Sequence, residues 1–240
     1  MFRVRPWVLL VALGACVARA NVVTTVSGSS LVVTGDSSPN AVAIEPALDG
    51  VTVVGFDGTL VDGSSEGVTV PGVRRLTVKL GKGSDRLTLT HVMLPDGLDL
   101  RLGRGNDSVW LDDVDGGASR IQTGNGHDAV SVFDVSLNRL SVQTSNGFDF
   151  VELDRAWISG DLDVDTGSDD DDVTIVATHI GDDVHVELGN DDDFVLLADV
   201  AVDDDTELDG EDGDDAAVFS GYIWFGDDLD IDGFSDDWWW

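Results

Sequence analysis

The sequence has very little of several residue types on which other folds depend. It contains one cysteine, one tyrosine and five prolines in 240 residues, and no Lys or Arg after residue 155. The single cysteine, Cys16, lies in an N-terminal leader, so we expect the exported chain to have neither disulfides nor thiolate metal sites. Its stability must then come from packing, from backbone pairing or from bound ions.

Residues 1–20 have the pattern of a secretory signal peptide. Arg3 and Arg5 precede an apolar run, and Ala18-Arg19-Ala20 has the form of an A-x-A cleavage site. The apolar run is too short to span a membrane, and no longer run follows it. The alternative is the lipobox-like Leu13-Gly14-Ala15-Cys16, whose cysteine would carry a lipid anchor. Either way we expect a secreted or cell-surface protein.

The charge is strongly acidic and unevenly distributed. There are 47 acidic and 13 basic residues, a formal net charge of −34, and removal of the three leader arginines gives −37. Residues 156–240 contain 29 acids and no base. Nucleic acid and anionic membrane surfaces are therefore poor partners, whereas divalent cations are good ones.

A repeat of about 22 residues dominates the chain. Each copy has a short alternating run, a turn of the form G-x-G-x-D and a second alternating run, as in "LTVKLGKGSDRLTL" and "LDLRLGRGNDSVWL". The turn aspartates are Asp85, Asp107, Asp128, Asp149, Asp171, Asp193 and Asp215, with spacings of 21 or 22 residues. Seven copies of such constant length indicate a solenoid.

The apolar residues of each copy form columns that we expect to face inward. The first column is Val78, Leu100, Ile121, Val142, Val164, Val186 and Leu208, and two more follow each turn, beginning at Leu87 and Leu89. Alternation with polar residues is the period of a half-buried strand. We therefore predict an all-β, single-stranded parallel β-helix of about seven coils, with a right-handed path as the expectation. An antiparallel meander is the competing fold.

The domain organisation follows from where the repeat begins and ends. Residues 21–75 do not match the repeat and are predicted to form a β cap over the open first coil. Residues 76–228 form the coils. Residues 229–240 form a degenerate last coil that ends in the aromatic run Trp238–Trp240.

Seven aspartates in register repel one another unless something neutralises them. In the first coils Lys82 and Arg104 stand beside the aspartates, whereas later turns replace such bases with more acid. Carboxylate-rich ligation without cysteine suits Ca²⁺. The predicted ligands are Asp85, Asp107, Asp128, Asp149, Asp169, Asp171, Asp191, Asp193 and Asp215. The alternative is an acidic, salt-adapted surface that binds no specific metal.

The turns resemble the calcium-binding nonapeptide repeats of RTX (hemolysin-type) proteins, G-G-x-G-x-D-x-U-x. Gly103-Arg104-Gly105-Asn106-Asp107-Ser108-Val109 matches this unit from its second glycine onward. The whole chain is similar to secreted bacterial G-x-G-x-D repeat proteins with a β-helical framework. These resemblances imply an extracellular calcium-binding solenoid. The period of about 22 residues departs from the RTX unit, and Asp169 and Asp191 stand where it has a second glycine.

The sequence favours a structural role over catalysis. No coil carries the long insertion that usually builds an active-site pocket, and no catalytic motif is present. We therefore expect a non-enzymatic surface, matrix or adhesive element, with a cell-surface polysaccharide or protein as its partner. The alternative is a calcium-dependent carbohydrate-active β-helix enzyme of the polysaccharide lyase type, whose basic residue would come from Lys79, Arg101 or Arg120.

Overall fold

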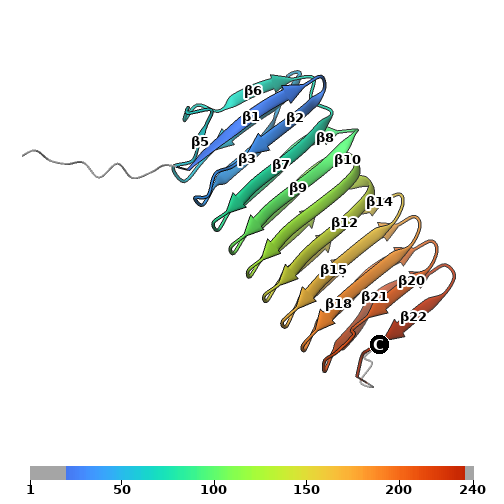
Figure 1. Cartoon of the computed structure of the whole chain (residues 1–240). Helices are drawn as coiled ribbons and strands as arrows, with labels where there is room; N and C mark the ends of the chain where they lie inside the picture. The colour runs from blue at the N-terminus through green and yellow to red at the C-terminus, as the bar shows by residue number, and fades with distance from the viewer. Residues whose placement is uncertain (1–19, 236–240) are drawn as a thin grey trace, which may run out of the picture.

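The computed structural model describes residues 20–235 and shows a parallel β-solenoid (Figure 1). Successive coils stack along one axis, and the strands of each coil pair in parallel with those of the next. There are about seven coils of about 22 residues, and the described part of the chain contains no helix. The predicted fold class is confirmed, and the antiparallel meander is excluded for the coils.

Two sheets make up most of each coil, and the chain passes between them at the G-x-G-x-D turns. The front sheet in Figure 1 contains β7 (Arg75–Lys82), β9 (Gly97–Arg104), the end of β10 (Ser108–Asn125), β12 (Ser136–Asn146), β15 (Leu162–Ser168), β18 (Val184–Asn190), β20 (Thr206–Asp209) and β22 (Leu229–Asp232). The rear sheet contains β8 (Arg86–Leu94), the start of β10, β11 (Ala129–Phe133), β13 (Phe150–Asp154), β16 (Asp172–Val176), β19 (Phe194–Val202) and β21 (Ala216–Phe225). A short third side includes β14 (Trp157–Ile158) and β17 (His179–Ile180).

The core consists of aliphatic ladders that run along the solenoid axis. The predicted column from Val78 to Leu208 is buried in every coil, as are the two columns that begin at Leu87 and Leu89. Each buried Val, Leu or Ile side chain contributes about 1.5–3 kcal/mol of transfer free energy. The alternating pattern therefore both sets the strand register and supplies the stability of the stack.

The N-terminal region covers the first coil with hairpins. Its strands are β1 (Asn21–Ser27), β2 (Ser30–Thr34), β3 (Ala41–Ala47), β4 (Gly50–Gly55), β5 (Leu60–Val61) and β6 (Val68–Pro71). The pairs β1–β2, β3–β4 and β4–β6 are antiparallel, whereas β2 and β3 pair in parallel with β7 and β8. Residues 30–44 thus already follow the path of a coil, whereas the sequence predicted coils only from residue 76 onward.

The two chain ends differ in what the structure describes. The predicted signal peptide, apart from Ala20, and the aromatic run Trp238–Trp240 lie outside the described residues. At the C-terminal end, β22 pairs with β20, and an isolated bridge joins Asp215 and Phe234. Among the described residues no helix is long and apolar enough to cross a membrane.

Candidate functional site

The turns between the two sheets place the repeated aspartates inside the solenoid. All seven turn aspartates are buried, with exposed fractions of 0–3 %. The turn glycines allow this path. Gly124, for example, has a φ of +99°, and a Cβ at this position would overlap the carbonyl oxygen of Gly103 in the preceding coil. Only glycine tolerates both this dihedral angle and this close approach.

The buried aspartates form a hydrogen-bonded ladder between coils. The main-chain N–H of each donates to Oδ1 of the aspartate in the next coil, at 2.7 Å from Asp85 to Asp107 and at 2.8 Å from Asp193 to Asp215. The intermediate steps, which involve Asp107, Asp128, Asp149, Asp171 and Asp193, all measure 2.7 Å. Each carboxyl therefore satisfies a turn amide that the sheet ladders leave unpaired.

The ladder begins in the N-terminal region. The N–H of Asn40 donates to Oδ1 of Asp85 at 2.7 Å, and Asn40 is itself buried. Asn40 thus takes the aspartate position of the coil that precedes Asp85. Asn40 was not predicted from the sequence. Its segment, "SLVVTGDSSPNAVAI", nevertheless has the order of a coil, with a strand-like run, a turn and a second strand-like run.

The second carboxyl oxygen has no such donor. All seven Oδ2 atoms are buried, and none has a well-formed hydrogen bond within residues 20–235. In three coils a buried threonine comes close. Thr123, Thr144 and Thr166 precede Asp128, Asp149 and Asp171 by five residues, but the hydroxyls of Thr144 and Thr166 donate to the carbonyl oxygens of Thr166 and Leu188 instead. Each ladder carboxyl therefore needs a proton or a cation to avoid an uncompensated buried charge.

The dominant effect on these carboxyls is desolvation. Burial raises the pKa of Asp85 and Asp149 to about 6, that of Asp107 and Asp193 to about 7 and that of Asp171 to about 8, against the opposing effect of the backbone hydrogen bonds. The pKa values of Asp128 and Asp215 are also raised, again mainly by burial. A proton is thus available to these groups at mildly acidic pH.

A second, solvent-exposed ladder runs in the opposite direction at the turn tips. Here the amide of a later coil donates to the side chain of the coil before it. Examples are Asp192 N–H to Oδ1 of Asp170 at 3.2 Å and Asp214 N–H to Oδ1 of Asp192 at 3.0 Å. His127 takes the same role toward the amide of Phe148 at 2.8 Å. The acceptor at this position varies in type, and Phe148, which has none, interrupts the ladder.

The two remaining predicted ligands also lie at the turn tips. Asp169 and Asp191 are exposed and occupy left-handed backbone positions, with φ of +76° and +79°. They replace the second turn glycine, and Oδ2 of Asp169 accepts a hydrogen bond of 3.1 Å from the N–H of Gly147. The structure thus divides the nine predicted calcium ligands into seven buried carboxyls and two exposed ones.

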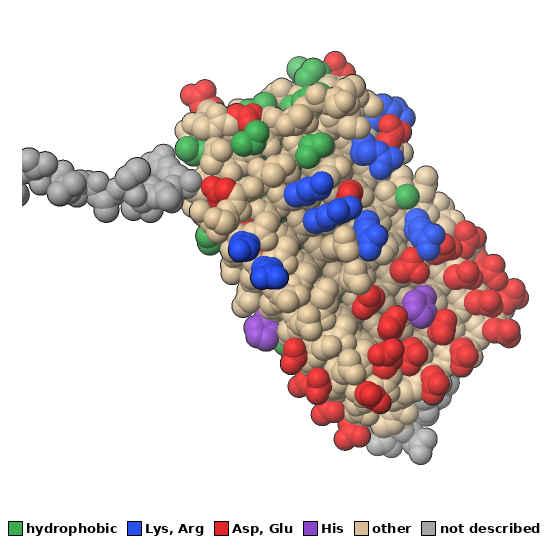
Figure 2. Space-filling model, in the orientation of Figure 1, with side chains coloured by type: hydrophobic (Ala, Val, Ile, Leu, Met, Phe, Trp, Pro, Cys, Tyr) green, Lys and Arg blue, Asp and Glu red, His purple; other side chains and the backbone are tan. Residues whose placement is uncertain are grey.

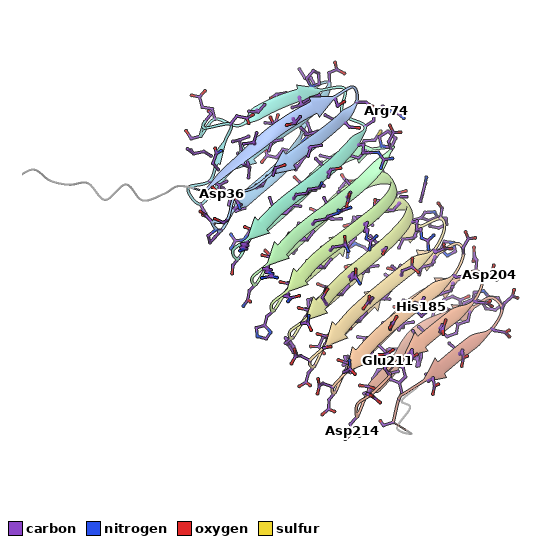
Figure 3. All side chains as sticks on the ribbon, viewed as in Figure 1. Asp36, Arg74, His185, Asp204, Glu211 and Asp214 are labelled. Atoms are coloured by element: carbon purple, nitrogen blue, oxygen red, sulfur yellow. The ribbon has the colours of Figure 1, made fainter. Side chains whose placement is uncertain are left out.

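A further acidic stack lies at the opposite corner, where the chain enters the front sheet. Carboxylate oxygens of Asp183, Asp204 and Asp205 lie within 4.8 Å of one another, and all three residues are exposed. The pKa of Asp204 is raised by desolvation and by the neighbouring charges, which include Asp183 and Asp227. Figure 3 labels Asp204 at this corner and Asp214 at a turn tip on the other side of the solenoid. None of the three residues of this stack is among the nine ligands predicted from the sequence.

The basic residues proposed for a lyase lie together on the front sheet. Lys79 and Arg101 are neighbours in the parallel register, and Arg120 lies in the adjacent column one coil further on. The guanidinium of Arg101 is held by both carboxylate oxygens of Asp99 at 2.9 Å. Arg101 is therefore accounted for as the basic partner of an exposed ion pair with Asp99, without a role as proton acceptor.

Comparison with known proteins adds no assignment. No protein-family model, no curated protein and no solved structure matches this chain.

Proposed function

We propose that this protein is an exported, non-enzymatic β-solenoid that serves as a cell-surface, matrix or adhesive element and binds calcium through its acidic C-terminal coils. The unbroken front-sheet register from β7 to β22 supports the structural role, because the rear-sheet bulge between Ala198 and Val200 adds one residue and no inserted loop encloses a substrate. A rigid rod with regularly spaced side chains suits display and contact over a long surface.

The observation that carries calcium binding is the corner stack. Ca²⁺ takes about six to eight oxygen ligands at roughly 2.3–2.6 Å, which carboxylates and water supply together. Asp183, Asp204 and Asp205 bring three such oxygens within 4.8 Å of one another, with Asp227 and Asp228 one coil further along. Figure 2 shows how densely acidic side chains cover this half of the molecule. A divalent cation would relieve their mutual repulsion.

The buried ladder fits calcium less well than the exposed acids do. Each ladder aspartate uses Oδ1 to accept a main-chain N–H, as Asp183 and Asp205 also do at the corner, but its other oxygen is buried away from the water that would complete a calcium shell. Adjacent coils are spaced at about 4.8 Å, so two such oxygens cannot complete a calcium shell without water in the core. We therefore place the ions at the corner stack and at turn-tip residues such as Asp169 and Asp191, and a proton on the ladder.

Calorimetric titration of Ca²⁺ into the EDTA-stripped protein tests this proposal. We expect binding in the micromolar to millimolar range with more than one ion, together with a rise in melting temperature. Asp183→Asn combined with Asp204→Asn should remove part of that binding, whereas the exposed control Asp115→Asn should not. Failure of Ca²⁺ to bind more tightly than Na⁺ would contradict it, and turnover of a polyuronate would instead support the lyase alternative.

A further inference from the structure

The front sheet carries an ordered charge sequence along its outward-facing side chains. One column stacks in parallel register from the first coil to the last: Lys79, Arg101, Gln122, Gln143, Asp165, Glu187, Asp209 and Asp232. The sign changes at the two glutamines, where Nε2 of Gln122 donates to Oε1 of Gln143 at 2.9 Å. Two bases thus precede a neutral pair, and four acids follow it, of which Asp165 and Glu187 lie as far from the pair as the two bases do.

The column that begins at Arg75 follows the same trend, whereas the column between these two, in which Asp99 precedes Arg120, does not. Arg75 in the first coil is in register with Asp183 five coils later, through Gly97, Ala118, Arg139 and Asp161. At the turn edge, Lys82 and Arg104 stack in the first two coils, and Asp212 occupies the equivalent position of the seventh coil. Lys79, Lys82 and Arg104 are exposed and make no ion pair within the described part of the chain. Figure 2 shows bases on the upper part of this face and acids on the lower part.

We propose that the front sheet is an interface for a second copy of this chain, packed face to face with the solenoid axes antiparallel. A two-fold axis along the strand direction reverses both the sheet normal and the solenoid axis, so each column faces itself in the opposite order. With the axis between Gln122 and Gln143, Lys79 faces Glu187 of the second copy and Arg101 faces Asp165. Arg75 faces Asp183, and each of these three contacts occurs twice.

A two-fold axis parallel to the solenoid axis would instead place bases on bases and acids on acids. The antiparallel arrangement does create one kind of like-charge contact, between Asp99 and Asp163, which also occurs twice. Each of these carboxylates is already bound to an arginine of its own chain, Asp99 to Arg101 at 2.9 Å and Asp163 to Arg139 at 2.8 Å. The like charges are therefore partly neutralised before the two copies meet.

A second copy fits this face better than a linear polyanion does. A polyanion would be attracted by the first two coils and repelled by every coil from Asp165 onward, whereas a second copy complements both halves. Six coils of about 4.8 Å and strands of five or six residues give a contact of roughly 500 Å² per copy, near the lower limit for specific association. The dimer should accordingly be weak and sensitive to salt.

Sedimentation velocity in EDTA tests the proposal, since EDTA removes cations that would bridge acids. At about 100 mM NaCl the Debye length, about 10 Å, matches the distance between packed sheets, so facing charges interact while the remote net charge is screened. We expect concentration-dependent dimers there and monomers at about 1 M NaCl. A wild-type protein that remains monomeric at about 100 mM NaCl and millimolar concentration would overturn the proposal.

Charge-swap variants test the arrangement itself. Lys79→Glu with Arg101→Glu, and separately Asp165→Lys with Glu187→Lys, should each abolish dimers because every facing pair in the column then has like sign. A mixture of these two variants should restore a dimer, as should all four changes in one chain. Arg86→Glu on the rear sheet is the control and should leave the dimer intact, and circular dichroism confirms folding. Failure of the mixture to associate, or loss of the dimer in the control, would refute the interface.

Discussion

The main-chain N–H of Asp149 donates a 2.7 Å hydrogen bond to Oδ1 of Asp171, the equivalent residue one coil further along the solenoid. Both side chains are buried, with exposed fractions of 0 % and 1 %. The aspartate of each repeat is thus a structural acceptor for the coil before it. This relationship explains why the residue recurs at one register, because each turn leaves the same amide to be satisfied.

Stability should fall as the pH rises from mildly acidic to mildly alkaline. The folded pKa of Asp171 is raised to about 8 and those of Asp107 and Asp193 to about 7, mainly by burial, whereas an unfolded aspartate titrates near about 3.9. A raised carboxyl pKa means that the folded state binds the proton more tightly. Its stabilising effect is complete below about pH 3.9 and is lost as the pH rises through about 6 to 8.

Thermal melting in EDTA at several pH values measures this effect. We expect the melting temperature to be several degrees higher at about pH 5 than at about pH 8. A melting temperature that rose over the same range would show that the ladder carboxylates are stable as anions, and would contradict a protonated ladder.

The effect of Asp171→Asn on the melting temperature should change sign between about pH 5 and about pH 8. The asparagine Oδ1 can accept the N–H of Asp149 as the carboxyl does, and the amide carries no charge. At about pH 8 the variant should melt above the wild type, since it removes a buried carboxylate. At about pH 5 it should melt at or below the wild type, because its second N–H donor is buried without an acceptor. Asp115→Asn, at an exposed position, is the matched control and should shift neither value.

Asp149→Ala should destabilise the protein at about pH 5, where the ladder carboxyl carries its proton. It removes the acceptor for the N–H of Asp128 and leaves that buried amide unsatisfied, which costs about 1–3 kcal/mol in the free energy of unfolding. Chemical denaturation of the variant and the wild type measures the difference. An unchanged free energy would mean that the ladder hydrogen bonds contribute nothing.

Gly124→Ala should prevent close stacking of two coils. The new Cβ would overlap the carbonyl oxygen of Gly103, and the residue would remain at a φ of +99°. We expect a loss above about 2 kcal/mol, since backbone atoms of both coils must move. Gly58→Ala is a useful control, because Gly58 has a φ of +90° but no atom within 4 Å of its added Cβ. The control separates dihedral strain from contact with the adjacent coil, so equal losses in the two variants would contradict a stacking role.

Much of the fold was predictable from the sequence because the repeat fixes the register. Columns such as Val78 to Leu208 were expected inside and are buried, and the constant spacing correctly predicted parallel stacking. The direction of the turn side chains was not predictable in the same way. Asp128 and His127 are adjacent in one turn, yet one is buried and the other exposed. Periodicity gives the position of a residue along the chain, but the φ values of the turn decide which side it faces.

The candidate site was harder to predict than the core for a related reason. Aspartate is rarely buried, so a register of seven suggested ligands at a surface. The need for an acceptor at each turn amide becomes visible only when consecutive coils are placed together. Asn40 was not predicted because its turn differs in length from the repeat. The segment from Gly35 to Asn40 is one residue longer than the equivalent segment from Gly81 to Asp85.

The most direct test of a protonated ladder is an NMR titration of the aspartate carboxyl carbons in the EDTA-stripped protein. We predict a small group of resonances that titrate between about pH 6 and 8, one of which, from Asp171, disappears in Asp171→Asn. Titration of every carboxyl below about pH 5 would show that the buried column is ionised, and would contradict the account.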